Sequence, residues 1–178
     1  IVVSSKLSGT MNSVTQAIQM IPEANIAVVD SFGASMSLGF PVLQAARAAL
    51  NGATLLECKA VAERARMQSN VYFVVDTLDF LHRGGRIGGA SHFVGTALNL
   101  KPILTLHEGK VEAIGKVRTQ KKAIEKMLDI VAEQLKHSRL VRISVLHANV
   151  PEQAQELLAE CNRRFNPSES ILTEVTPV

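Results

Sequence analysis

The chain has 178 residues, 47% of them apolar, and a formal net charge of +3. This length and composition allow a real hydrophobic core, in one domain or in two small ones. No apolar run approaches the ~20 residues of a membrane-spanning helix, and no basic-then-apolar leader opens the sequence, so we expect a cytoplasmic protein without stable membrane insertion.

The first portion of the sequence alternates strand-like and helix-like segments. Strands are predicted at 1–3 and 25–30, and helices at 12–20, 38–50 and 55–67. Ser8 or Thr10 could cap the first helix. Strand, helix, strand, helix predicts an α/β domain with a parallel sheet.

The second portion mixes hairpin and crossover patterns. Strands are predicted at 71–75, 103–106, 111–117, 141–146 and from Ile171, and helices near Leu78, at 93–100, at 121–136 and from Pro151. The turn at 107–110 should close a hairpin, and the last strand should lie parallel to 141–146. We therefore expect two domains, residues 1–69 and a mixed-sheet α/β domain at 70–178.

The two ends of the sequence are strand-like. The chain opens without Met and closes on a strand-like segment. We expect it to be an internal piece of a longer protein.

Cysteine and histidine spacing gives no support to metal binding. Cys58 and Cys161 lie far apart without a CxxC pair, which favours reduced, buried thiols. None of the five histidines forms an HxxxH or HExxH pattern. The sequence predicts no metal site.

Positive charge is concentrated between Lys101 and Lys126. This stretch holds seven Lys and Arg residues against Glu108, Glu112 and Glu125, and it contains no aromatic residue. Nucleic-acid binding usually adds aromatic side chains that stack on bases. A solvated face or a protein-docking surface is therefore favoured over a nucleic-acid site.

The segment Ser4 to Thr10 connects a strand to a helix. It brings hydroxyl groups to a helix N-terminus, where backbone N–H groups and the helix dipole favour an anion. The nucleotide-binding patterns GxxxxGK[ST] and GxGxxG are absent, and so is the nucleophile pattern GxSxG. From the residues alone, the segment is either an anion site or a helix cap.

Arg83-Gly-Gly-Arg86 is a second candidate anion site. Two guanidiniums beside flexible glycines can hold a carboxylate or a phosphate. The same pattern also fits a helix C-terminus with glycine in the left-handed conformation. Asp30 and Asp76 each follow a strand, where they would be ligands or N-caps. No clear base accompanies a nucleophile, so covalent catalysis has little support.

Several motifs in a fixed order carry a family resemblance. They are Ser4-Ser-Lys-Leu-Ser-Gly-Thr10, Val29-Asp-Ser31 followed by Ser35-Met36, Phe73-Val-Val-Asp-Thr-Leu78, Arg83-Gly-Gly-Arg-Ile-Gly88, Leu100-Lys-Pro-Ile103 and Gly115-Lys-Val-Arg118. Together they resemble the DegV family along essentially the whole chain.

The resemblance implies a two-domain α/β fatty-acid-binding protein whose first, parallel-sheet domain is incomplete here. Such a protein does no chemistry and needs no cofactor; it presents a long-chain fatty acid to a separate fatty acid kinase subunit, which makes an acyl phosphate for phospholipid synthesis. The implied carboxylate site is Ser8 with Gly9 and Thr10, and the acyl chain fills an apolar tunnel. Arg86, or else Arg83, would lie near the ligand or the kinase-docking surface.

Two departures from the family pattern are visible. The family's upstream Thr-Ser motif and downstream Gly-Thr-His-x-Gly-Pro-Gly segment have no counterpart, and Ser37 stands where glycine is expected.

A phosphotransfer or hydrolytic enzyme that uses Ser8-Gly9-Thr10 is the alternative function, and a nucleic-acid-binding regulator is a third hypothesis.

Overall fold

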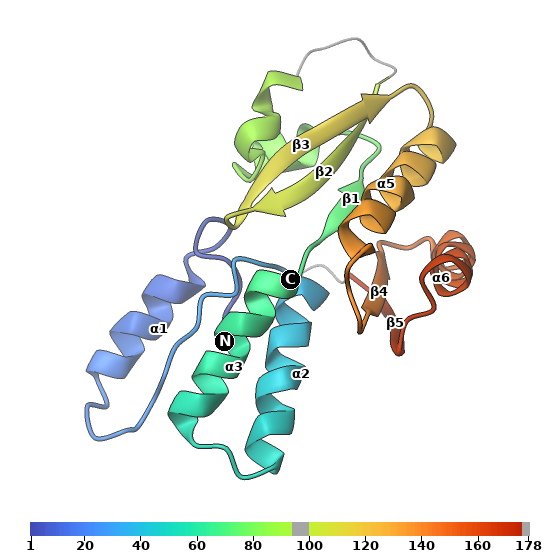
Figure 1. Cartoon of the computed structure of the whole chain (residues 1–178). Helices are drawn as coiled ribbons and strands as arrows, with labels where there is room; N and C mark the ends of the chain where they lie inside the picture. The colour runs from blue at the N-terminus through green and yellow to red at the C-terminus, as the bar shows by residue number, and fades with distance from the viewer. Residues whose placement is uncertain (94–99, 176–178) are drawn as a thin grey trace. The chain divides into compact units, whose positions relative to one another are not determined.

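The computed structural model of the chain describes residues 1–93 and 100–175. It divides into two compact units, Ile1–Ala123 and Ile124–Val178 (Figure 1). Helices accompany both antiparallel and parallel strand pairs, which confirms the predicted α/β class. The predicted domain boundary near residue 69 stays a prediction.

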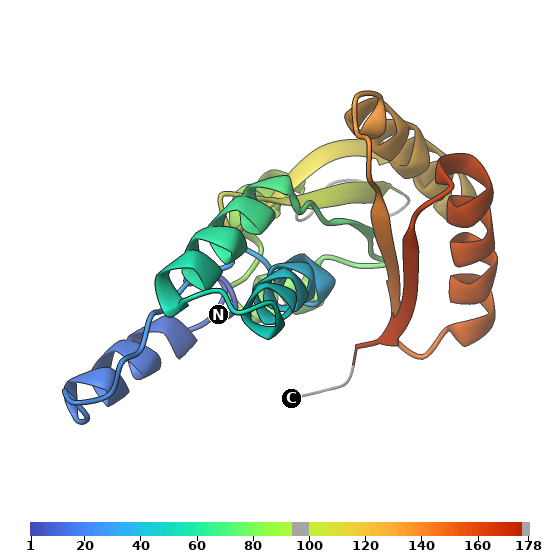
Figure 2. The same cartoon turned by 60° about the horizontal axis from the view of Figure 1, so that its bottom comes forward.

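Three helices form the N-terminal half of the first unit. They are α1 (Thr10–Gln19), α2 (Met36–Leu50) and α3 (Leu55–Gln68), so all three predicted helices are confirmed. Helices α2 and α3 pack side by side (Figures 1 and 2). A capping box, in which Thr54 and Glu57 exchange hydrogen bonds, fixes the start of α3.

The two strands predicted before α2 are reduced to one parallel bridge between Val2 and Asp30. Val2 donates to the Val29 carbonyl at 3.0 Å, and Ser31 donates to the Val2 carbonyl at 3.1 Å. The prediction of strands over 1–3 and 25–30 is wrong, because the second segment turns at Phe32, whose φ is +50°, and the Ser4 N–H donates to the Gly33 carbonyl at 2.9 Å instead of continuing the ladder.

An antiparallel sheet in the order β1-β2-β3 completes the first unit. Its strands are β1 (Tyr72–Val74), β2 (Lys101–His107) and β3 (Lys110–Val117). The predicted hairpin is confirmed, and its two turn residues, Glu108 and Gly109, both have positive φ, as a type I′ turn requires.

Short helical segments cover one face of this sheet. Helix α4 (Asp79–Arg83) and the 3-10 helix η1 (Gly88–Phe93) follow β1. Their apolar side chains surround the buried residues Ala90, Leu104 and Val111. The helix predicted at 93–100 falls largely on residues 94–99, outside the described residues.

The second unit is a parallel strand pair packed against helices. Helix α5 (Gln120–Leu135), which contains the unit boundary, precedes β4 (Arg142–His147), α6 (Pro151–Phe165) and β5 (Glu169–Glu174). Strands β4 and β5 pair in parallel, as predicted, with α6 beside them (Figure 2).

The core of the second unit gathers apolar side chains from both helices and both strands. Leu128, Val145, Ala154 and Cys161 are buried there. Burial raises the pKa of the Cys161 thiol to about 11, which keeps the thiol neutral. Cys58 and Cys161 are both free, as the sequence predicted; Cys161 is buried as expected, whereas the prediction of a buried Cys58 is wrong because that side chain is only half-buried. Among the described residues, no helix is long and apolar enough to cross a membrane.

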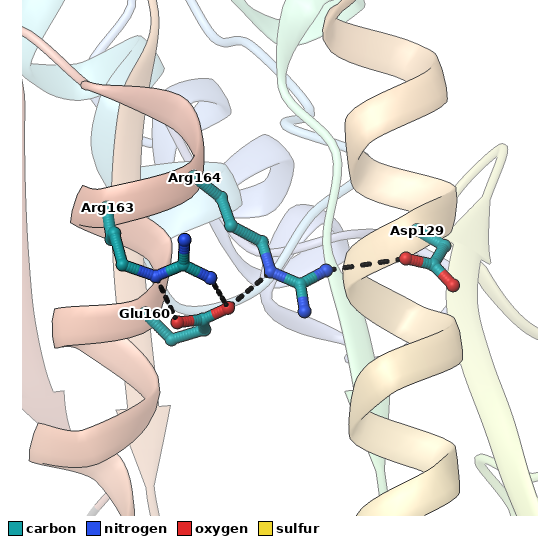
Figure 3. A network of polar contacts seen from close by, with 4 residues as sticks. All are labelled: Asp129, Glu160, Arg163 and Arg164. Atoms are coloured by element: carbon teal, nitrogen blue, oxygen red, sulfur yellow. Dashed lines mark hydrogen bonds and ion pairs between the residues drawn. The ribbon is translucent and has the colours of Figure 1, made fainter.

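A polar network joins α5 to α6 on the surface of the second unit (Figure 3). Arg163 donates to Glu160 through Nε at 2.9 Å and Nη2 at 2.7 Å, and Arg164 also donates to this carboxylate. Arg164 reaches Asp129 on α5 at 3.3 Å. The hydrogen bonds from Arg163 and Arg164 lower the pKa of Glu160 from 4.5 to about 2.

This lowered pKa predicts how the stability of the second unit depends on pH. Between pH 4.5 and about 2 the unfolded chain takes up a proton at Glu160 that the folded chain does not. The stability that Glu160 contributes is thus complete above pH 4.5 and is lost as the pH falls to about 2. Urea unfolding should find Glu160→Gln less stable than the unmodified protein at pH 7 and equal to it near pH 2.

Glu156→Gln is the matched control, because Glu156 lies on the same helix and has no ion pair among the described residues. The stability difference between Glu156→Gln and the unmodified protein should not change between pH 7 and pH 2. A Glu160→Gln deficit that stays constant from pH 7 to pH 2 would contradict the assignment.

Candidate functional site

Residues 4–9, which we call the Ser8 loop, form a compact turn before α1. The N–H groups of Leu7 and Ser8 donate to the Ser4 carbonyl at 3.0 and 3.1 Å, and the Lys6 N–H donates to Ser4 Oγ at 3.1 Å. The Leu7 side chain packs against the core of the first unit. The loop is therefore wound around Ser4 and anchored by Leu7.

The hydroxyl groups of Ser8 and Thr10 face each other at the start of α1. Their oxygen atoms lie 2.8 Å apart, and the Thr10 N–H donates to Ser8 Oγ at 3.3 Å. The prediction that one of them is the N-cap is wrong. Gly9 holds that position and no side chain caps the helix, because Ser8 turns toward Thr10 instead.

An uncapped helix start beside two hydroxyl groups suits a carboxylate. Within the described part of the chain, the N–H groups of Met11 and Asn12 have no hydrogen-bond acceptor. Both hydroxyls can rotate to donate outward, and the positive end of the helix dipole lies behind them. The arrangement can hold an anion.

Hydrogen bonds to four other residues fix the Ser8 loop. The fully buried Ser4 hydroxyl donates to the Gly109 carbonyl at 2.8 Å, and the Ser4 N–H donates to the Gly33 carbonyl at 2.9 Å. The Ser5 N–H lies 3.3 Å from both carboxylate oxygens of Asp30. Arg86 Nε donates to the Leu7 carbonyl at 2.9 Å. The loop is thus braced by the β2–β3 turn, by Asp30 of the parallel bridge and the segment that follows it, and by the end of α4.

Asp30 and Asp76 are not N-caps. The Asp30 carboxylate accepts the Ser5 and Phe32 N–H groups, whereas the N-cap of α2 is Ser35. Asp76 forms an ion pair with Lys101 at 2.8 Å, and α4 begins after Leu78. The N-cap alternative fails because neither aspartate directly precedes a helix.

The Asp30 segment is itself held from α3. Arg66 donates to the Asp30 carbonyl at 2.8 Å, and its guanidinium lies 4.5 Å from the centre of the Phe32 ring. Phe32 has a φ of +50°, which is unusual for a residue other than glycine. Asp30 therefore braces the Ser8 loop, through the Ser5 N–H, and its own segment, through the Phe32 N–H.

Arg83-Gly-Gly-Arg86 forms the C-terminus of α4. This is the alternative in which the segment ends a helix with a left-handed glycine. Gly85 has a φ of +69°, its N–H donates to the His82 carbonyl, and the Arg86 N–H donates to the Leu81 carbonyl. This pair of bonds is a Schellman motif. The glycine pair therefore ends the helix and sends the chain back toward the core.

The two arginine side chains have different surroundings. The Arg86 guanidinium donates to the carbonyl groups of Leu7 and Gly84. Arg83 is exposed and has no partner among the described residues. The structure thus brings Arg86, and not Arg83, into contact with the Ser8 loop.

The basic segment from Lys101 to Lys126 is mostly solvated. Lys101 pairs with Asp76, and Lys116 Nζ lies 5.3 Å from the centre of the Phe93 ring. The other five Lys and Arg residues are exposed: Lys110, Arg118, Lys121, Lys122 and Lys126. Across residues 1–93 and 100–175, no group of three or more His, Cys, Asp or Glu side chains could hold a metal ion.

One groove of about 540 Å³ lies between α2 and α3. It is lined by Ala48, Asn51, Gly52, Ala53, Glu57, Ala60, Val61 and Arg64. None of the predicted site residues lines it.

Sequence reasoning missed the residues that support the loop. Ser4 was noted only as one of several hydroxyls, and Gly109 only as a turn residue. A glycine at the second position of a two-residue hairpin gives a signal for positive φ. Nothing in the local pattern connects it to Ser4, 105 residues away.

The fold is that of an α/β protein with a three-stranded antiparallel sheet and a parallel strand pair. The chain belongs to the DegV family: the family model described as "Uncharacterised protein, DegV family" matches residues 1–178. The resemblance found from the motifs is thereby confirmed.

Several relatives are similar over nearly the whole chain. A DegV domain-containing protein of Clostridium acetobutylicum is 37% identical over 100% of this chain and 64% of its own length. A structure described as "Fatty Acid Binding of a DegV family Protein from Thermus thermophilus" is 40% identical with a TM-score of 0.87, over 97% of this chain and 61% of that chain. DegV of Bacillus subtilis, described as a fatty acid binding protein, is 30% identical with a TM-score of 0.84, over the same shares. The chain thus spans less than two thirds of each relative.

The contact between Gly109 and Ser4 predicts a cost for any side chain at position 109. Gly109 has a φ of +82°, and a Cβ there would lie 2.3 Å from Ser4 Oγ. Gly109→Ala should lower the free energy of unfolding by about 1–2 kcal/mol for the left-handed backbone and by roughly 1–3 kcal/mol more for the displaced Ser4. Urea unfolding measures the sum.

Gly52→Ala separates the two effects. Gly52 has a φ of +85°, and a Cβ there would meet nothing within 4 Å. This variant should show only the backbone cost. Equal losses in the two variants would mean that the Ser4 contact contributes nothing.

Proposed function

We propose that this protein binds a long-chain fatty acid, with the carboxylate at Ser8, Gly9 and Thr10 and the acyl chain in an apolar tunnel. One observation carries the proposal: the Ser8 and Thr10 hydroxyls lie 2.8 Å apart at a helix start that has no side-chain cap. The fatty-acid-binding descriptions of the Thermus thermophilus and Bacillus subtilis relatives support the choice of ligand.

The chemistry of the loop suits a fatty-acid head group. A carboxylate that leaves water needs hydrogen-bond donors, and two hydroxyls with first-turn N–H groups supply them. The acyl chain supplies the affinity, because each buried methylene gains about 0.8 kcal/mol. The head-group site therefore needs only to orient the carboxylate, because the acyl chain provides most of the binding energy.

Binding is favoured over catalysis at this loop. The Ser8 hydroxyl bonds to the Thr10 hydroxyl and N–H, and no imidazole or carboxylate among the described residues is bonded to it. A serine nucleophile normally has a base within hydrogen-bond distance. We therefore infer that the acyl phosphate is made by a separate fatty acid kinase subunit in the cytoplasm, to which this protein presents its ligand.

Ser8→Ala tests the head-group site. The change removes one donor to a charged group, so affinity for oleate should fall roughly tenfold to a hundredfold. Isothermal titration or displacement of a fluorescent fatty acid on the purified protein measures the loss. Ser138→Ala, at an exposed serine of the second unit, makes the same chemical change and should leave affinity unaltered.

Equal affinities in Ser8→Ala and Ser138→Ala would refute the assigned site. A protein that contains no fatty acid after purification, takes up none and instead hydrolyses an ester or phosphate substrate in a Ser8-dependent way would establish the alternative enzyme. Native mass spectrometry followed by lipid extraction distinguishes these cases.

Arg83 is the proposed docking residue for the kinase subunit. It is exposed, and Phe80, three residues earlier on α4, is 77% exposed. Arginine and aromatic side chains dominate protein interfaces, so Arg83→Ala should lower acyl phosphate formation roughly tenfold at limiting kinase subunit. Affinity for oleate should not change.

Arg139→Ala, another exposed arginine, is the control and should affect neither quantity. Unchanged acyl phosphate formation in Arg83→Ala would remove this residue from the docking surface. A parallel loss of oleate affinity would place it at the ligand instead.

A further inference from the structure

The hydrogen bond between Arg86 and Leu7 links the end of α4 to the residue directly before Ser8. Arg86 Nε donates to the Leu7 carbonyl at 2.9 Å. We propose that Arg86 is a positioning residue, which fixes the Ser8 loop through this carbonyl and does not itself bind the carboxylate of the ligand. The ligand part of this inference rests on the proposed function.

The peptide unit between Leu7 and Ser8 is held at both of its polar ends. Its carbonyl accepts from Arg86, and its N–H, which belongs to Ser8, donates to the Ser4 carbonyl at 3.1 Å. Because the peptide is planar, it can rotate only as a whole. Rotation of this plane about its Cα–Cα axis would therefore break both hydrogen bonds, and loss of the bond from Arg86 leaves the plane held only by its bond to Ser4.

Arg86 is itself placed by a rigid segment. Its N–H closes the Schellman motif on the Leu81 carbonyl at 2.9 Å, and Leu81 and Ile87 both pack into the core of the first unit. A second guanidinium donor reaches the Gly84 carbonyl. The side chain that holds Leu7 thus starts from a fixed backbone and has two acceptors.

The contacts of Arg86 are explained without direct binding of the carboxylate. Arg86 donates hydrogen bonds to two neutral main-chain carbonyls, those of Leu7 and Gly84. Leu7 belongs to the loop that carries the Ser8 hydroxyl. Moving the guanidinium onto a ligand would release the Leu7 carbonyl at the moment when Ser8 must be in place. Positioning therefore explains the observed contacts without a rearrangement.

The first experiment needs no ligand. Amide hydrogen exchange of the ligand-free protein should be faster at Leu7 and Ser8 in Arg86→Met by roughly threefold to tenfold, because an anchor of the loop is lost. Arg86→Lys, which keeps a donor, should recover part of the protection. Arg83→Met makes the same change three residues earlier and should match the unmodified protein. Unchanged exchange at Leu104 and Val111, in the core, shows that each variant is folded.

The second experiment is a double-mutant cycle of oleate affinity. Arg86→Met alone should weaken binding roughly threefold to tenfold, whereas in the Ser8→Ala background it should cost less than about twofold, because Arg86 acts through Ser8. Additive losses would mean that Arg86 contacts the ligand independently and would overturn the proposal.

The two experiments separate this inference from the proposed function. If exchange at Leu7 and Ser8 is the same in Arg86→Met as in the unmodified protein, the positioning role is overturned, whether or not the protein binds a fatty acid. Faster exchange in a protein that takes up no oleate supports the positioning role and refutes the fatty-acid site.

Discussion

The buried hydrogen bond from the Ser4 hydroxyl to the Gly109 carbonyl determines where the candidate site forms. It joins residues 105 positions apart, and it is made by a fully buried side chain. Without it, a buried polar group would lose its partner, at a cost of about 1–3 kcal/mol. The same serine accepts N–H groups from Lys6, Leu7 and Ser8 through its hydroxyl and its carbonyl. One residue thus sets both the winding of the loop and its place against the β2–β3 turn.

The polar groups of the loop divide into those that hold it and those that remain available. The N–H groups of Ser5, Lys6, Leu7 and Ser8 are all used within the protein. The hydroxyls of Ser8 and Thr10 instead bond to each other at the surface. A carboxylate can replace that one neutral bond with charge-assisted bonds and leave the supporting bonds intact. A site built this way can gain and lose its ligand without unfolding the loop.

The sequence predicted what depends on local periodicity. The apolar spacing along α5 and α6, the glycine in the β2–β3 turn and the parallel return of β5 all follow from residues close together in the chain. The errors concern features that distant residues decide. The parallel bridge at Val2 is short because the partner segment turns at Phe32, so that the Ser4 N–H donates to the Gly33 carbonyl, and the Asp30 carboxylate accepts the N–H of Ser5 from the Ser8 loop. No pattern within ten residues carries that information.

The arginine segment shows how far a family resemblance reaches. The resemblance brought two arginines to the neighbourhood of the ligand without separating them. Gly85 separates them, because its left-handed conformation turns the chain between Arg83 and Arg86. Arg86 then lies against the Leu7 carbonyl, while Arg83 stays on the exposed surface of α4. A motif assigns a role to a segment, whereas the backbone turn inside the motif decides which side chain can perform it.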